Sequence, residues 1–313
     1  MISVNARITP LSAFGTLLKG DTLFGQFCWA IRNHLGESRL RKLLEGYTNG
    51  LPFAVVSDAL PSGYLPRPVL PMHWFVHTDP SERKQAKKKI WLPMTQFDES
   101  ITNWPSHFVA PDEKSRIKAL PQPHNVIDRR SGTTGEGFSP YNMTQHWYAD
   151  APLDIHIALD DSQLSLNELR SMLENMGAFG YGRDASIGLG KFRLDALQTQ
   201  PIREQQQANA WLTLAPSAPQ NLILDAERCF YQVFTRFGRH GDAAVHSGKP
   251  FKAPVLMAQT GAVLTPKTYE TRSFIGSGLG GDGSLSNAVR ETVQQGYAPV
   301  VGIRLPTVAE KVA

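Results

Sequence analysis

The sequence predicts an α+β fold of the ferredoxin-like, split βαβ type, and three observations support this prediction. Apolar and polar residues alternate over 2–8 and 153–160, as is typical of half-buried strands. Apolar residues recur at spacings of three and four over 21–35 and 166–176, which places them on one helical face. With a strand after each helix, the chain order is strand, helix, strand, strand, helix, strand.

The first predicted helix begins near Asp21, whose carboxylate can accept hydrogen bonds from the free N–H groups of the first turn. Gly36 is the predicted C-cap. A short second helix is expected over 38–46, and the apolar run at 51–56 is expected to form a buried strand. These segments form the first half of the split βαβ unit.

A long insertion is predicted between about residues 61 and 150. Eleven prolines interrupt both helix and strand there, and four of the six tryptophans argue against disorder. We expect an ordered insertion with edge hairpins. Its basic cluster at 83–89 is interpreted first as a solvated face, with binding of a polyanion as the alternative.

The second predicted helix has stronger end signals than the first. Ser165 is its expected N-cap, and Glu168 stands three residues later, as in a capping box. Gly177 is expected to end this helix, and a strand at 191–194 follows. The first domain is therefore predicted to span residues 1–200.

The remaining residues, 201–313, are predicted to form a second, β-rich domain. One short helix is expected there, near 286–295. The predicted strands lie at 211–214, 229–237, 255–257, 262–264 and 297–305.

Length and composition exclude several protein classes. A chain of 313 residues buries roughly three quarters of its unfolded surface and needs no disulfide or metal for a core. No apolar run reaches the roughly 18 residues of a membrane span, and the N-terminus lacks a secretory signal, so a cytoplasmic protein without a membrane partner is expected. Cys28 and Cys229 have no CxxC neighbour and are expected to be buried and free. The net charge of +4 permits a polyanionic partner.

The glycine-rich segment 177–191, GAFGYGRDASIGLGK, is the first candidate site. Successive amides in such a loop can form an anion-binding concavity, to which side chains add phosphate contacts. It is not a Walker A loop, because no GK[ST] follows and the helix precedes the glycines. The alternative is a tight loop between helix and strand. The candidate residues here, with one from the loop before the first helix, are Gly180, Gly182, Arg183, Ser186, Gly188, Lys191 and Lys19.

The second candidate is the polar segment 124–137, HNVIDRRSGTTGEG. It offers many donors for phosphate or ribose oxygens, and arginine gives bidentate, charge-assisted contacts. The alternative is a solvated hairpin tip in which Asp128 pairs with its own arginines. The candidate residues are His124, Asn125, Arg129, Arg130 and Thr133.

Catalytic, metal and cofactor sites receive little support from the sequence. The segment 276–283, GSGLGGDG, contains a GGD triplet but a single carboxylate, Asp282, which argues against a cyclase. His73 and His77 lie in a strand-like run, where their spacing does not suit zinc. No Ser-His-Asp or Cys-His signature is present. A ribonuclease acting through His124 or His146 stays the alternative to a noncatalytic protein.

Five segments taken in order resemble a known family. They are GDTLFGQFCWAIR, PSGYLPRPVLP, HNVIDRRSGTTGEG, GAFGYGRDASIGLGKF and GYAPVVGI. The set is similar to the fourth Csm subunit of type III-A CRISPR effector complexes, a member of the RAMP superfamily and its five-prime-handle-binding group. The likeness runs from about residue 1 to residue 305. The third subunit of type III-B complexes is the nearest competitor.

The resemblance implies two RAMP modules, both of ferredoxin-like type, in a ribonucleoprotein of antiviral defence. It implies a noncatalytic subunit that holds the 5′ repeat-derived handle of the CRISPR RNA. It also implies docking beside the large polymerase-like subunit and the backbone RAMP subunit. Arg130 and Ser131 depart from the family's commoner residues, whereas Arg129 matches. Because a single-stranded handle exposes its bases, the insertion's Trp91, Trp104 and Trp147 are candidate stacking platforms, with core positions as the alternative.

Overall fold

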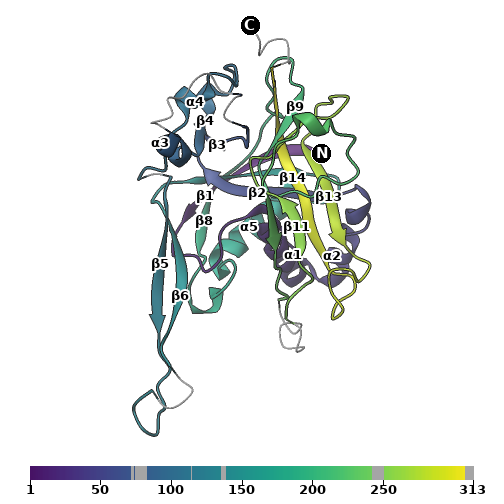
Figure 1. The fold of residues 1–313 in the computed structure, drawn as a ribbon. Helices are drawn as coiled ribbons and strands as arrows, with labels where there is room; N and C mark the ends of the chain where they lie inside the picture. Colours follow the sequence, from purple (N-terminus) through teal and green to yellow (C-terminus); the bar gives the residue numbers. More distant parts are fainter. Residues whose placement is uncertain (72–73, 75–82, 114, 135–138, 242–249, 307–313) are drawn as a thin grey trace.

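The computed structural model describes residues 1–313 except 72–73, 75–82, 114, 135–138, 242–249 and 307–313. Two four-stranded sheets, a helical layer on the first sheet and a projecting hairpin make up the molecule (Figure 1). The mixture of helices and strands confirms the predicted α+β class.

The first sheet has the strand order β2-β7-β1-β8. Its strands are β1 (Ile2–Pro10), β2 (Ala54–Pro61), β7 (Leu153–Leu159) and β8 (Phe192–Thr199). Every neighbouring pair is antiparallel, and β7 lies between β1 and β2. This order is the one in which a strand is inserted between two strands that a helix connects.

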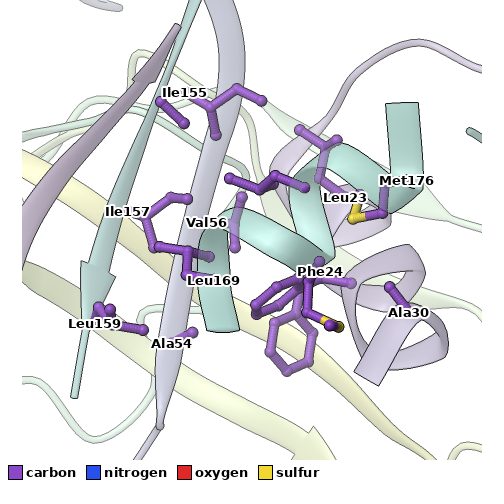
Figure 2. Packing of buried hydrophobic residues seen from close by; sticks show 14 of the residues in the cluster. Leu23, Phe24, Ala30, Ala54, Val56, Ile155, Ile157, Leu159, Leu169 and Met176 are labelled. Atoms are coloured by element: carbon purple, nitrogen blue, oxygen red, sulfur yellow. The ribbon is translucent and has the colours of Figure 1, made fainter. Parts of the chain in front are cut away.

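Two helices, α1 (Gly20–Leu35) and α5 (Leu166–Phe179), cover one face of this sheet. Figure 2 shows Leu23 and Phe24 of α1, Met176 of α5 and Ile157 of β7 within one apolar core. A third helix, α2 (Glu37–Leu43), follows α1 and is close to the predicted range. The buried apolar faces of α1 and α5 follow the three- and four-residue spacing seen in the sequence.

The start of α1 differs from the prediction. Lys19, not Asp21, is the N-cap residue, and its side chain makes no capping hydrogen bond. Asp21 lies inside the first turn, is buried, and is bound by Arg236. The predicted N-cap was wrong because the Asp21 carboxylate is bound by Arg236, which lies far away in the sequence.

The capping box of α5 is confirmed. Ser165 accepts from the backbone N–H of Glu168, whose carboxylate accepts from the Ser165 N–H at 2.8 Å. The helix continues past Gly177 to Phe179 and is capped by Gly180. Gly177 is required for another reason: a Cβ there would overlap the carbonyl oxygen of Phe192 on β8.

The second sheet has the order β12-β9-β14-β13. Its strands are β9 (Ala210–Thr213), β12 (Val263–Leu264), β13 (Phe274–Gly280) and β14 (Val293–Ile303). A two-stranded ribbon, β10 (Val233–Arg236) and β11 (Val255–Ala258), accompanies it. The strands expected in this half are confirmed, with shifted ends at 229–237 and 297–305.

The helix predicted near 286–295 is wrong. Residues 284–292 form turns and bends, and β14 begins at Val293. The Gln295 side chain donates to the Val56 carbonyl and accepts from the Val56 N–H, both at 2.8 Å, which ties β14 to β2. This tertiary pairing overrides local helix propensity. Residues 276–280 of the GGD-containing segment belong to strand β13.

The described part of the insertion is ordered, as expected, and its apolar side chains share a core with the second sheet. Its elements are β3 (Tyr64–Pro66), α3 (Arg83–Lys88), β4 (Trp91–Pro93), α4 (Trp104–His107), β5 (Ile117–His124) and β6 (Tyr141–Tyr148). Phe97 and Trp104 are fully buried and pack with Leu212 and Val301 of the second sheet. The β5–β6 hairpin projects from the body (Figure 1). Its Pro121 and Pro123 lie opposite Thr144 and Asn142.

Single turns of 3₁₀ helix complete the fold. They are η1 (Tyr47–Asn49), η4 (Met94–Gln96), η5 (Ala185–Ile187) and η6 (Ala226–Arg228). Cys28 and Cys229 are both free and at least partly buried. Within the described ranges, no helix is both long and apolar enough to cross a membrane.

Candidate nucleic-acid interface

The glycine-rich segment 177–191 is bound tightly to the loop that precedes α1. Gly190 donates its N–H to the Ala13 carbonyl at 2.8 Å, and the Tyr181 hydroxyl donates to the Leu17 carbonyl at 2.9 Å. The Lys191 N–H donates to the Ser12 hydroxyl at 2.9 Å. The two loops therefore form one surface beside the N-terminus of α1.

Most glycines of this surface serve the packing of the two loops. Gly180 and Gly182 have φ of 100° and 76°, and a Cβ on either would press on Leu189 or Thr16. Gly188 also has a positive φ, 98°, but faces open space. We therefore keep the prediction that a ligand approaches the backbone closely for Gly188 only. At Gly180 and Gly182, protein atoms occupy the space that a ligand would need.

Arg183 joins the glycine-rich loop to the hairpin. Its guanidinium donates to the Thr144 carbonyl of β6 at 2.7 Å and pairs with Asp184 at 3.1 Å. Phe14 and His146 exchange two backbone hydrogen bonds of 2.8 Å at the same place. Burial and the Arg183 charge lower the pKa of His146. The base of the hairpin is thereby fixed, and the side chains of Ser186 and Lys191 are exposed beside it.

Lys19 is half-buried and bound in a polar network. Its ammonium pairs with Asp58 at 2.7 Å. Asp58 also accepts from the Gly20 N–H at 2.8 Å and from the Thr260 hydroxyl at 2.6 Å. Part of the Lys19 side chain reaches solvent, so it can add positive potential to this surface. The bond from Thr260 to Asp58 connects the network to the second half of the chain.

A second link between the halves was not visible in the sequence. Arg236 of β10 binds both carboxylate oxygens of Asp21, at 2.6 and 2.9 Å. Burial raises the pKa of Asp21, and the Arg236 charge acts in the opposite direction. Because 215 positions separate the partners, no local pattern could have indicated the pair.

The polar segment predicted as the second site forms the hairpin tip. Asp128 accepts from the backbone N–H of Arg130 at 2.9 Å and donates its own N–H to the Thr133 carbonyl. The tip turn is thus held by backbone contacts, and the side chains of Asn125, Arg129, Arg130 and Thr133 are exposed. The part of this segment at 135–137 lies outside the described residues.

One face of the hairpin carries stacking surfaces. His124 stacks on Tyr141 across the strands, with ring centroids 5.3 Å apart and planes inclined by 13°. Trp147 is exposed and lies opposite Lys118 on the same face. Trp104 is fully buried and Trp91 is half-buried, so Trp147 is the tryptophan that the structure leaves available for stacking.

The candidate residues therefore fall into two groups. The first group lies on the glycine-rich loop and the loop before α1, which meet the hairpin at Thr144 in the middle of β6, and the second begins at the end of the strands near Tyr141. Three residues of strand, roughly 10 Å, separate these points, and the tip extends beyond them. In the basic cluster, Lys84, Lys87 and Lys88 are exposed on or beside α3, as a solvated face requires. His73 and His77 lie outside the described residues.

Metal chemistry receives no support from the part of the chain that the structure describes. No group of three or more His, Cys, Asp or Glu side chains there could hold a metal ion. The described surface carries arginine and lysine donors, backbone amides and aromatic rings. These are groups that meet phosphates and unstacked bases.

No family model matches the sequence, and no curated protein matches it. Solved structures match over nearly the full length. A chain of the Csm1–Csm4 cassette in complex with pppApA has a TM-score of 0.62 at 16% identity, with 97% of this chain and 98% of that chain covered. A chain of the Csm3–Csm4 subcomplex in the type III-A CRISPR-Cas interference complex has a TM-score of 0.61 at 13% identity, with 97% and 100% covered. The component common to both is Csm4.

The Csm1–Csm4 cassette in complex with cA4 gives the same result, with a TM-score of 0.62 at 17% identity and 97% and 99% coverage. At such identities the likeness concerns the fold. A Csm4-like fold agrees with the resemblance found in the sequence motifs, and it extends across both sheets and the insertion.

Proposed function

We propose that this chain is a Csm4-like, noncatalytic RNA-binding subunit of a type III-A CRISPR effector complex. It holds the 5′ handle of the CRISPR RNA and docks the large subunit and the backbone RAMP subunit. The full-length fold likeness to chains from two different Csm4 complexes carries this proposal. The exposed donors and rings along the hairpin support the RNA-binding part of it.

The two halves of the chain correspond, in this proposal, to two RAMP modules, at 1–200 and 201–313. The order β2-β7-β1-β8 with helices α1 and α5 supports a ferredoxin-like first module. The order β12-β9-β14-β13 supplies the sheet of the second. The hairpin is then an insertion in the first module.

RNA binding would use both groups of candidate residues. At the tip, Arg129 and Arg130 offer forked donors for phosphate oxygens. Along the strands, Trp147 and the His124–Tyr141 pair offer surfaces on which bases stack. On the glycine-rich loop, the Lys191 ammonium and the open backbone at Gly188 supply further phosphate contacts.

The test is the affinity of the full-length chain for a repeat-derived 5′ handle RNA at two salt concentrations. Arg129→Ala should weaken binding by roughly 1–3 kcal/mol, because it removes a charge-assisted contact. Arg129→Lys should restore part of this loss, since the ammonium keeps the charge without the planar fork. Arg170→Ala, an exposed arginine on α5, is the matched control and should bind as wild type does.

Unchanged RNA affinity in Arg129→Ala would show that this residue does not belong to the site. Full rescue by Arg129→Lys would show that only the positive charge of Arg129 matters and not its planar fork. Incubation of repeat RNA with the protein in the absence of metal tests the endoribonuclease alternative. A specific cut that His124→Ala abolishes would establish that alternative. Binding without cleavage is the expected result.

A further inference from the structure

One face of the β10–β11 ribbon presents large apolar side chains to solvent. Val233, Phe237, Phe251 and Leu256 are 56, 68, 65 and 66% exposed. Leu256 lies opposite Thr235, and Phe251 lies opposite Arg239. Because side chains alternate between the two faces of a ribbon, these residues share one face. We call it the outer face: Val233, Thr235, Phe237, Arg239, Phe251 and Leu256.

The opposite face of the ribbon is covered by the body of the protein. Arg236 reaches Asp21 on α1, and Met257, opposite Phe234, is buried. Farther along, the backbone at Gly241 lies against the ring of Trp29 on α1. The ribbon is therefore held along α1 by one face, and its outer face has no covering among the described residues.

An apolar groove continues the outer face at the start of β10. Its volume is about 680 Å³, and its lining includes Leu70, Leu224, Phe230 and Tyr231. Tyr231 is itself half exposed and precedes Val233 by two residues. A row of exposed apolar side chains that leads into a groove is the arrangement in which a partner's anchor side chain is buried.

We propose that the outer face and this groove form the docking surface for the large subunit of the effector complex. The inference rests on the proposed function and identifies the surface used. The Csm1–Csm4 pair occurs in crystal structures with different bound nucleotides, pppApA in one and cA4 in another. Subunits that form a stable pair bury interfaces with apolar cores.

The chemistry of the outer face favours a protein over RNA. Arg239 is the one charged side chain among its six residues, whereas RNA affinity comes mainly from several neutralised phosphates. A protein partner would place apolar side chains over Phe237 and Leu256 and one anchor in the groove. A carboxylate opposite Arg239 would complete the rim.

The test measures the affinity of the full-length chain for the purified large subunit. Leu256→Asp should weaken binding at least tenfold, because it places a charge in the apolar centre of the interface. Leu51→Asp is the matched control, since Leu51 is the same residue type and is 67% exposed elsewhere. It should change binding less than twofold. Both variants should bind handle RNA as wild type does, and amides at 233–236 and 255–258 should gain protection from hydrogen exchange when the large subunit binds.

Three results would overturn the inference. Wild-type binding to the large subunit by Leu256→Asp, without amide protection in the ribbon, would place the interface elsewhere. Loss of RNA binding in Leu256→Asp alone would make the outer face an RNA surface. A wild-type dimer that Leu256→Asp dissociates would identify a second copy as the occupant. If wild type itself binds neither the large subunit nor handle RNA, the proposed function fails and not merely the choice of surface.

Discussion

The Asp21 carboxylate is a buried charge that depends on one arginine in the other half of the chain. Arg236 binds both of its oxygens, and the Asp21 side chain is nearly inaccessible. Removing one partner of a buried ion pair leaves the other charge uncompensated, at a cost of roughly 3–5 kcal/mol. We predict that Asp21→Ala lowers the free energy of unfolding in urea by about 3 kcal/mol.

Asp195→Ala is the matched control, because Asp195 pairs with the exposed side chain of Arg193. Its loss should stay within about 1 kcal/mol. A loss of only about 1 kcal/mol in Asp21→Ala would contradict the role of a buried ion pair.

At the scale of the residue, exposed donors could be predicted from the sequence, whereas the partners of buried charges could not. The donors at the hairpin tip could be named from their types, since arginine and histidine in a polar loop indicate an exposed surface. The partners of Asp21 and Asp58 could not, because Arg236 and Thr260 come near these carboxylates only through the fold. Equally, no pattern shows that Gly180 and Gly182 face protein atoms while Gly188 faces solvent.

Two glycines inside helices illustrate opposite roles at the scale of the element. A Cβ on Gly25 of α1 would meet nothing within 4 Å, whereas one on Gly177 of α5 would overlap the Phe192 carbonyl oxygen. We predict that Gly25→Ala stabilises the protein by roughly 0.5–1 kcal/mol, since alanine has the higher helix propensity. Gly177→Ala should destabilise it by roughly 1–3 kcal/mol, because α5 must move away from β8.

Thermal unfolding of the two variants, each compared with wild type, measures this difference. Equal shifts in the same direction would show that α5 does not press on β8 as the structure indicates. Elements with local signals were predicted well: the α5 capping box is confirmed at Ser165 and Glu168. The helix expected near 286–295 was wrong, because β14 is specified by its pairing with β13 and by the bonds between Gln295 and Val56 of β2, 239 positions away.

At the scale of the whole molecule, a buried histidine makes stability depend on pH. Burial lowers the pKa of His156 from 6.5 to about 4, with Arg203 acting in the same direction and Asp154 against it. Its Nδ1 meets the Gln200 side-chain amide at 3.0 Å. Below pH 6.5 the unfolded chain binds this proton before the folded chain does, so stability decreases as the pH falls from about 6.5 to 4.

We predict that wild type loses up to about 3 kcal/mol more than His156→Gln between pH 7 and pH 4. Urea unfolding of both proteins at several pH values measures the difference. The comparison removes the contributions of His146 and His240, whose pKa values are also lowered by burial. Parallel curves for the two proteins would contradict the assignment.

The prolines of the projecting hairpin also matter for the molecule as a whole. Pro121 and Pro123 stand at alternate positions of β5, which pairs with β6. Proline has no N–H to donate, and in sheets it is tolerated where that N–H would face solvent. The free edge of β5 therefore lacks N–H donors at two successive outward positions, which disfavours pairing with a second hairpin along this edge. A long exposed ribbon can thus reach toward a ligand with one of its edges protected against cross-β pairing between neighbouring molecules.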